Sequence, residues 1–266
     1  MINKIRHVFS RYINDRLVSA NTFRILEQKT LCAENVASFS LFGKSLRYIK
    51  GAQLNIEKYK SIFPEFVCRF YISSDLPFSF IEELQKENCE IFIMDAQGID
   101  LTYTFWRFLA ADDIEKKIFF IRDIDSAASE QERALYEEWL TSGYQYNIIR
   151  SHYSHNTRIM AGMWGGKTKR DFIKPSLKHI WRFRNKYGRD QKFLSKIIYP
   201  KIIENCFVQD VIRRYDNESP SLIQVDELMY SFMGEIATDE DMRNEWREEF
   251  KRLHVEYKKN NSSSIR

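Results

Sequence analysis

The chain has 266 residues, of which 44% are hydrophobic and 15% aromatic, enough apolar side chains for one large core. Lys and Arg outnumber Asp and Glu by only 41 to 37, and this small excess argues against a nucleic-acid-binding protein. No run of about 18 apolar residues occurs and the N-terminus lacks the apolar segment of a secretory signal, so we expect neither a spanning helix nor secretion.

The first 34 residues form a basic, partly amphipathic extension. Positive charges outnumber acidic residues there, which predicts either a solvated helix or peripheral contact with an anionic membrane surface. Both alternatives remain open on the sequence alone.

Strands and helices alternate through residues 35–215, which we expect to form the main domain. The predicted strands are 36–42, 66–73, 89–94, 117–122, 146–150 and 206–211, and the predicted helices are 46–62, 77–87, 103–113, 128–142, 178–186 and 190–204. Such alternation with short connections predicts an α/β fold with a mostly parallel sheet flanked by helices. Residues 151–169 mix His, Tyr, Trp and Gly and are interpreted as a loop that lines a site. Residues 216–266 are expected to hold a helix at 239–255 and a disordered tail.

The expected strand at 117–122 runs directly into Asp123 and Asp125. Side chains alternate along a strand, so both carboxylates project to the same side as the chain leaves the sheet. Two hard oxygen ligands suit Mg²⁺ or Mn²⁺ and leave positions open for phosphate oxygens. A turn or a cap for the following helix is the alternative.

The glycine-rich segment 162–168 is similar to a phosphate-binding loop, but its first glycine is one position too close to Gly166-Lys-Thr. The glycines beside Trp164 instead favour close approach of the backbone to a flat ligand such as a sugar ring.

Several segments, in this order, resemble the GT-A glycosyltransferases related to glycogenin and to bacterial lipooligosaccharide galactosyltransferases. Segment 105–113 (Phe-Trp-Arg-Phe-Leu-Ala-Ala-Asp-Asp) and segment 119–126 resemble their Arg-bearing helix and the strand that ends in Asp-X-Asp. Segment 187–194 resembles the Asp-Gln-Asp helix start of those retaining enzymes. Segments 150–155 and 161–167 resemble a bacterial and viral group of surface-glycan transferases, which has Asp and Pro where this chain has Ser151 and Tyr153.

The resemblance covers about residues 36–211 and implies a GT-A fold with a metal and a donor site. Asp123 and Asp125 would hold the metal, and Gln209 or Asp210 would replace a histidine that serves the family as a third ligand. Asp190 and Gln191 would lie beside the anomeric carbon. The residues implied in donor or sugar contact are Arg107, Arg122, Asp123, His152, His155, Trp164, Gly165 and Lys167.

Each implied role has a structural alternative. Arg107 could instead pair with Asp112 or Asp113, and Trp164 could belong to the core. The two histidines could simply be exposed, and Asp190 could cap a helix.

The expected function is therefore a metal-dependent hexosyltransferase with a nucleoside-diphosphate sugar as donor and retention at the anomeric carbon. The implied acceptor is a surface glycan or glycolipid, such as lipopolysaccharide, lipooligosaccharide or capsule. Four cysteines without a Cys-X-X-Cys pair indicate reduced thiols and a cytoplasmic protein, with peripheral association at the inner membrane face as the further alternative.

Two other functions compete with this one. A haloacid-dehalogenase-like phosphatase also places Asp-X-Asp after a strand and would use Asp123 as its nucleophile. That fold normally puts the motif on an early strand, whereas at least three expected strands precede it here. The second competitor is a catalytically decayed transferase that binds glycan without turnover.

Overall fold

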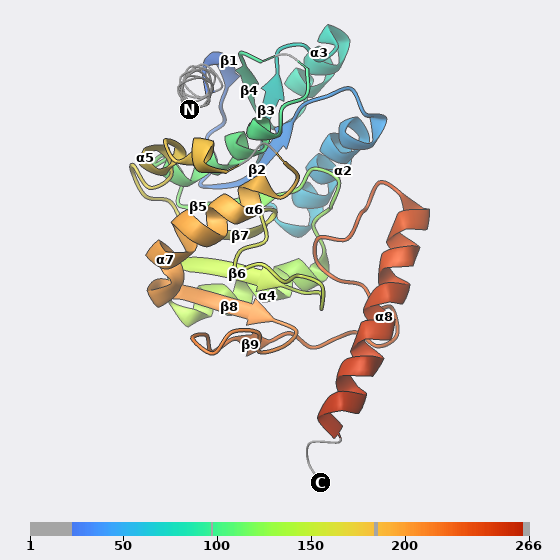
Figure 1. Ribbon diagram of the computed structural model, residues 1–266. Coiled ribbons are helices and arrows are strands. Elements are labelled where there is room, and N and C mark those ends of the chain that lie inside the picture. The colour runs from blue at the N-terminus through green and yellow to red at the C-terminus, as the bar shows by residue number, and fades with distance from the viewer. Residues whose placement is uncertain (1–22, 97, 184–185, 263–266) are drawn as a thin grey trace, which may run out of the picture.

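The computed structural model describes residues 23–96, 98–183 and 186–262 (Figure 1). Nine strands of this part of the chain form one sheet in the order β1-β4-β3-β2-β5-β7-β6-β8-β9. The strands are β1 (Ile25–Lys29), β2 (Asn35–Leu41), β3 (Phe66–Ser73), β4 (Glu90–Met94), β5 (Ile118–Arg122), β6 (Tyr146–Arg150), β7 (Met163–Lys167), β8 (Cys206–Asp210) and β9 (Ser221–Leu222). Neighbours pair in parallel except β1 with β4, and β7 with both β5 and β6. The expected α/β fold with a mostly parallel sheet is confirmed.

Helices flank both faces of this sheet. The α-helices are α2 (Leu46–Ile62), α3 (Phe78–Lys86), α4 (Glu130–Ser142), α5 (Lys174–Leu177), α6 (Arg189–Phe193), α7 (Tyr199–Ile202) and α8 (Glu240–Ser262). The 3₁₀ helices are η1 (Leu101–Asp112), η2 (Ile180–Arg182) and η4 (Ile203–Asn205), and η3 (Leu194–Ile198) is a π-helical turn. Within the described residues, no helix is both long enough and apolar enough to cross a membrane.

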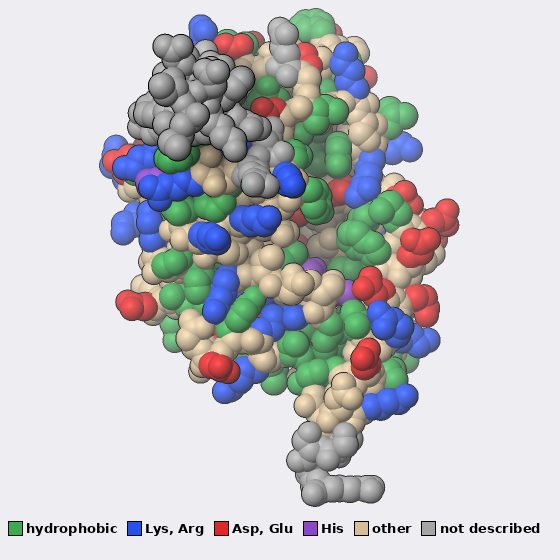
Figure 2. Space-filling view, viewed as in Figure 1, with side chains coloured by type: hydrophobic (Ala, Val, Ile, Leu, Met, Phe, Trp, Pro, Cys, Tyr) green, Lys and Arg blue, Asp and Glu red, His purple; other side chains and the backbone are tan. Residues whose placement is uncertain are grey.

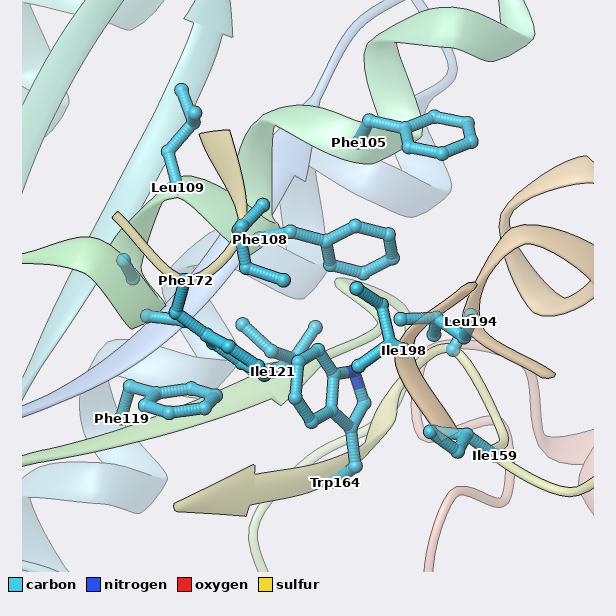
Figure 3. Close-up of a cluster of buried hydrophobic side chains, with 14 of the residues drawn as sticks. Phe105, Phe108, Leu109, Phe119, Ile121, Ile159, Trp164, Phe172, Leu194 and Ile198 are labelled. Atoms are coloured by element: carbon cyan, nitrogen blue, oxygen red, sulfur yellow. The ribbon is translucent and has the colours of Figure 1, made fainter. Parts of the chain in front are cut away.

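Each face of the sheet has its own apolar core. On β5, Phe119 and Ile121 pack with residues of η1, η3 and β7 (Figure 3). Phe120, which points the other way, packs in the cluster that includes α2, α3 and α4. Because both faces are covered, β5 is a continuous apolar run rather than an alternating one.

A third, smaller cluster joins α8 to the rest of the molecule. Ile149 of β6 and Leu135 of α4 pack there with Phe232 and with Phe250 of α8. Figure 1 shows α8 as a long helix along one side of the molecule, and its Met242 contacts Arg47 of α2. The first turns of α8 are therefore brought to the same region as the start of α2.

Several predicted elements were wrong. Part of the predicted loop 151–169 is the antiparallel strand β7, where a Cβ on Gly165 would come within 2.5 Å of the Phe119 carbonyl oxygen. Such close backbone packing needs glycine, which weakens the strand signal in the sequence. The predicted helix at 178–186 was wrong, because among its described residues only Ile180–Arg182 are helical and Gly188 (φ +73°) then turns the chain. The predicted helix at 190–204 is confirmed, since helical turns run without a break from Arg189 to Asn205, with a π-helical turn at Leu194–Ile198.

The predicted N-terminal extension is described only from residue 23. Residues 1–22, which carry most of the basic segment, lie outside the described residues. Residues 25–29 form β1, an edge strand antiparallel to β4.

Candidate active site

A cleft opens at the carboxyl edge of the sheet, where the strand order reverses. Strands β4, β3 and β2 follow one another in one direction, and β5 continues the sheet on the other side of β2. Open α/β sheets bind ligands at such a reversal point, outside the carboxyl ends of the strands. A cavity of about 580 Å³ lies here, and residues that follow β2 and β5 directly, Phe42 and Asp123, both line it.

The cleft carries charges of both signs. Its acidic side chains are Asp123, Asp125 and Asp190, and its basic side chains are Lys44, Arg47, Arg107, Lys186 and Arg189. This excess of positive charge around a carboxylate pair suits a polyanion that arrives with a divalent cation.

Arg107 of η1 links two of the three acids. Its guanidinium pairs with Asp123 and, at 3.0 Å, with Asp190 Oδ2, and it donates to the Arg122 carbonyl oxygen at 2.9 Å. Burial disfavours its charge, but the two carboxylates outweigh burial and raise the pKa of Arg107. The alternative partners of Arg107 were wrong, because Asp112 accepts from the backbone at residues 172–174 and Asp113 pairs with Arg69.

Asp125 is the less exposed member of the Asp-X-Asp pair. Its side chain is 18% exposed, against 52% for Asp123, and it pairs with Arg47 in the first turn of α2. Burial first, and the negative charge of Asp123 second, raise the pKa of Asp125 above its usual value, although Arg47 opposes them. The two carboxylates are thus close enough to interact, as the alternation along the strand predicted.

The backbone of the Asp-X-Asp turn is held by residues that the sequence did not single out. Asn55 of α2 is buried and its Nδ2 donates to the carbonyl oxygens of Ile124 (3.1 Å) and Ser126 (2.8 Å). Gly51, one turn earlier, has no room for a Cβ because the Ile124 carbonyl group fills that space. In the sequence, the sign of this close packing was a glycine and an asparagine inside an otherwise regular helical pattern.

Gly162 makes a second close approach, from the loop before β7. A Cβ there would overlap the Asp123 carboxylate and lie 2.8 Å from the Asp123 backbone nitrogen. The glycine-rich segment therefore has a place at the site, through Gly162 rather than through Gly165.

Asp190 and Gln191 both line the cleft, at the start of α6. Asp190 Oδ1 accepts from the Gln191 backbone nitrogen at 2.9 Å while Oδ2 accepts from Arg107. Asp190 therefore lies in the first turn of α6 and faces the cleft, and it does not cap the helix, whose N-cap residue is Gly188.

Arg122 lies outside the cleft. Its side chain points to the face of β5 opposite the one that Asp123 faces. There it pairs with Glu132 of α4 at 2.5 Å and lies over the Phe120 ring. Successive residues of a strand face opposite sides, so Arg122 and Asp123 could not both reach one ligand. We exclude Arg122 from the site.

Trp164, Gly165 and Lys167 of β7 also lie elsewhere. Trp164 is fully buried and packs edge-to-face against Phe108 and Phe119 (Figure 3). Lys167 pairs with Ile118 at the start of β5, which is the amino edge of the sheet and the end opposite the cleft. No sugar can stack on a tryptophan without an exposed face, so its core alternative holds.

Gln209 and Asp210 are not placed to be the third metal ligand. Asp210 is fully buried and pairs with Arg150 at 2.7 Å and Arg214 at 3.1 Å. Gln209 bonds to Asn147 and Glu138, and β7 and β6 separate its strand from β5. Within the described residues, no three His, Cys, Asp or Glu side chains are grouped to hold a metal.

His152 and His155 lie beneath α8 and are buried, which excludes their expected exposed alternative. The His152 ring packs against Phe232 and Phe250, with centroids 4.5 and 4.8 Å apart. Burial lowers the pKa of His152 to about 4 and that of His155 well below its usual value. Both rings are therefore neutral near pH 7, and neither lines the cleft described above.

Aromatic side chains that sequence reasoning missed do line the cleft. Tyr48 comes from α2, Tyr187 from the turn before α6, and Trp246 from the second turn of α8. Trp246 reaches the cleft through tertiary packing of the C-terminal segment, for which no local sequence signal exists.

No protein-family model and no curated protein matches this chain. Among solved structures it is similar to a glycosyltransferase involved in the glycosylation of the major capsid of PBCV-1, with 15% identity and a TM-score of 0.42 over 66% of this chain and 81% of that one. It is similar to 4-diphosphocytidyl-2C-methyl-D-erythritol synthase from Anaerococcus prevotii, with 11% identity and a TM-score of 0.48 over 82% and 98% of the two chains. It is also similar to a mannosyltransferase from Pyrobaculum calidifontis in complex with GDP-Man and Mn²⁺, with 11% identity and a TM-score of 0.42 over 80% and 68%.

The fold is GT-A-like. The strand order, with its reversal at β2 and β5 and the antiparallel β7 beside β5, is the observation that supports this statement. In this GT-A-like fold the Asp-X-Asp pair follows β5 and faces the cleft, where it can hold a divalent cation next to a bound anion.

Proposed function

We propose that this protein transfers a sugar from a nucleoside-diphosphate sugar to a glycan hydroxyl, with the help of Mg²⁺ or Mn²⁺. One observation carries the proposal. Asp123 and Asp125 share a cleft at the reversal point of the sheet, and each pairs with an arginine from a different element. Cations and carboxylates placed together in this way fit a metal-bound diphosphate.

The donor diphosphate would lie between the start of α2 and the turn before α6. Lys44 and Arg47 stand at the amino end of α2, where Ser45 makes no side-chain cap bond, and Lys186 faces them from the other element. Backbone N–H groups at a helix start attract phosphate in addition to these charges.

The carboxylate pair fits a divalent cation that takes its remaining ligands from phosphate oxygens and water. Asp123 and Asp125 would hold it, and the bound metal would neutralise the leaving diphosphate. Arg47 would then be free to contact a phosphate, because the metal would replace it at Asp125. In this arrangement β8 supplies no third metal ligand.

Asp190 and Gln191 would face the sugar of the donor. Arg107 holds Asp190 in place and keeps it next to Asp123. We carry retention at the anomeric carbon as part of the proposal, and the anomeric configuration of the first product, read by NMR, tests it.

We propose a surface glycan or its lipid-linked precursor as the acceptor, on the resemblance of segments 150–155 and 161–167. Tyr187 and Trp246 line the cleft and give it aromatic walls that suit a sugar ring. The four free cysteines support a cytoplasmic enzyme. We keep the division into 1–34, 35–215 and 216–266, with the last part contributing Met242 and Trp246 to the cleft.

The test is a thermal-shift screen of nucleoside diphosphates with and without Mn²⁺. One diphosphate should stabilise the wild type in a metal-dependent way, because a ligand that binds only the native state raises its apparent stability. Asp125→Asn should lose that shift and donor hydrolysis, whereas Asp216→Asn, a substitution of an exposed aspartate, should keep both.

Two outcomes would replace the proposal. A covalent adduct at Asp123 formed with a phosphate mimic would favour the phosphatase, although four described strands precede β5. Glycan binding without donor binding or hydrolysis would favour the decayed module.

A further inference from the structure

The positive charge of the chain is concentrated in one segment. Residues 167–201 contain twelve Lys and Arg but only two Asp, whereas the other residues hold 29 basic and 35 acidic side chains. The small net charge of the whole chain therefore conceals a strongly basic part and an acidic remainder.

These basic side chains gather on one face of the molecule. Figure 2 shows Lys and Arg over the region that α5, α6 and α7 occupy in Figure 1. Lys201 of α7 donates to Ser176 Oγ of α5 at 2.7 Å, which ties the two elements together. Burial and then the charges of Arg182, Lys178 and Lys201 lower the pKa of His179, so these three charges lie near it.

The charges on this face are available for a partner. Ten basic side chains from the described part of the segment are exposed, and none of these ten takes part in an ion pair of the described residues: Lys167, Lys169, Arg170, Lys174, Lys178, Arg182, Lys186, Lys192, Lys196 and Lys201. Unpaired like charges repel one another, so an anionic surface would stabilise them.

We propose that the face formed by α5, η2, α6 and α7 docks on an anionic phospholipid membrane. Clusters of Lys and Arg bind anionic lipid headgroups in this way, through many weak and salt-sensitive contacts. The proposal does not rest on the proposed function, since docking needs no turnover. It also uses a surface other than the basic N-terminal residues 1–22.

Two observations favour a membrane over a soluble polyanion. The charges spread from the end of β7 over α5, η2 and the helical turns from α6 to α7, and of the ten only Lys174 and Lys186 line either of the two cavities at the sheet edges. Tyr187, next to Lys186, is 92% exposed, and a tyrosine with a polar tip is favoured at headgroup level. Because Lys186 and Tyr187 also line the cleft, docking would bring the cleft mouth close to the lipid surface.

The test is co-sedimentation of the full chain with vesicles. Vesicles with about one third phosphatidylglycerol in phosphatidylcholine should bind the protein, pure phosphatidylcholine should not, and binding should fall as salt rises above about 0.1 M. The triple variant Lys178→Glu, Arg182→Glu, Lys201→Glu should bind about a hundredfold more weakly.

A matched control reverses three exposed charges on the other face of the sheet, Lys58→Glu, Lys60→Glu and Lys86→Glu of α2 and α3. It should bind vesicles as the wild type does. Equal losses in both triple variants, or no binding of the wild type to phosphatidylglycerol, would overturn the proposal. Binding to dextran sulfate without binding to vesicles would overturn it in favour of a polyanionic polymer.

Discussion

At the scale of single residues, the site depends on a glycine that lacks a side chain as much as on its charged residues. Gly162 leaves the space that the Asp123 carboxylate occupies, and Arg107 then holds that carboxylate with Asp190. A metal ligand displaced by even about 0.5 Å loses its productive geometry. The orientation of Asp123 is therefore as much a property of Gly162 as of the Asp-X-Asp motif.

Gly162→Ala should weaken metal-dependent diphosphate binding by about tenfold or more, because the new Cβ displaces the carboxylate. Isothermal titration with Mn²⁺ and the diphosphate identified in the screen measures this. Gly166→Ala is the matched control, since its Cβ would meet the Tyr146 ring at 2.6 Å at the opposite end of β7. It should lower stability and leave binding intact, and equal binding losses would contradict the assignment.

At the scale of elements, α2 positions the Asp-X-Asp turn and α8 closes the cleft beside it. Asn55 reaches two carbonyl oxygens of the turn, and the Asp125 carbonyl oxygen accepts from the Ala237 backbone nitrogen just before α8. The turn is thus held from two sides by segments far apart in sequence.

Asn55→Ala should lower the free energy of unfolding by about 1–3 kcal/mol, because it leaves the buried carbonyl groups of Ile124 and Ser126 without this donor. Urea denaturation measures the change. Ser61→Ala, on the exposed end of the same helix, is the control and should be close to neutral. If Asn55→Ala lost stability but kept full metal-dependent binding, the hydrogen bonds of Asn55 would have no role in positioning Asp125.

The packing of α8 should be sensitive to acid. The pKa of His152 is near 6.5 in the unfolded chain and about 4 in the folded one, so between these values the unfolded state binds more protons. Above pH 6.5 the free energy of unfolding should therefore keep its full value. As the pH drops from 6.5 toward 4, it should fall by about 1.4 kcal/mol per pH unit because of this residue.

Urea denaturation at several pH values measures this loss, and the folded His155, whose pKa is also lowered, should add to it. His152→Gln removes one titrating group and should make the dependence shallower. An unchanged slope in that variant would place the acid sensitivity elsewhere in the chain.

At the scale of the whole molecule, the two edges of the sheet have separate roles. The amino edge also has a cavity, of about 850 Å³, but the buried Arg69, Glu90 and Lys116 on its wall are already paired. Arg69 pairs with Glu90 at 2.6 Å and with Asp113 at 2.5 Å, and Lys116 pairs with Glu90 at 2.7 Å. We assign stability to this edge and ligand binding to the carboxyl edge.

Arg69→Met should lower the free energy of unfolding by about 3–5 kcal/mol, because Glu90 would lose a partner inside the protein. Diphosphate binding should persist at temperatures where the variant stays folded. Lys117→Met is the control: its partner Glu34 and Lys117 itself are 69% and 70% exposed, so it should cost no more than about 1 kcal/mol. Calorimetry gives the stabilities, and a loss of binding in folded Arg69→Met would contradict the separation of roles.

The sequence by itself determined the α/β order and the Asp-X-Asp pair at the end of β5. Both follow from local rules: apolar runs of strand length, helical spacing, and the alternation of side chains that puts Asp123 and Asp125 on one side. Arg107, Asp190 and Gln191 also reached the cleft as the resemblance implied.

Only the tertiary structure decided which other residues join them. Trp164 was misplaced because its burial depends on neighbours distant in sequence, such as Phe108. Arg122 was misplaced although alternation along the strand already put it opposite Asp123, and the structure shows that its partner there is Glu132. Asn55, Gly162 and Trp246 act through contacts across the fold that leave no periodic signal in the chain. A local sequence pattern determines the face of a helix or strand to which a side chain points. The elements that pack against that face determine which residues the side chain contacts.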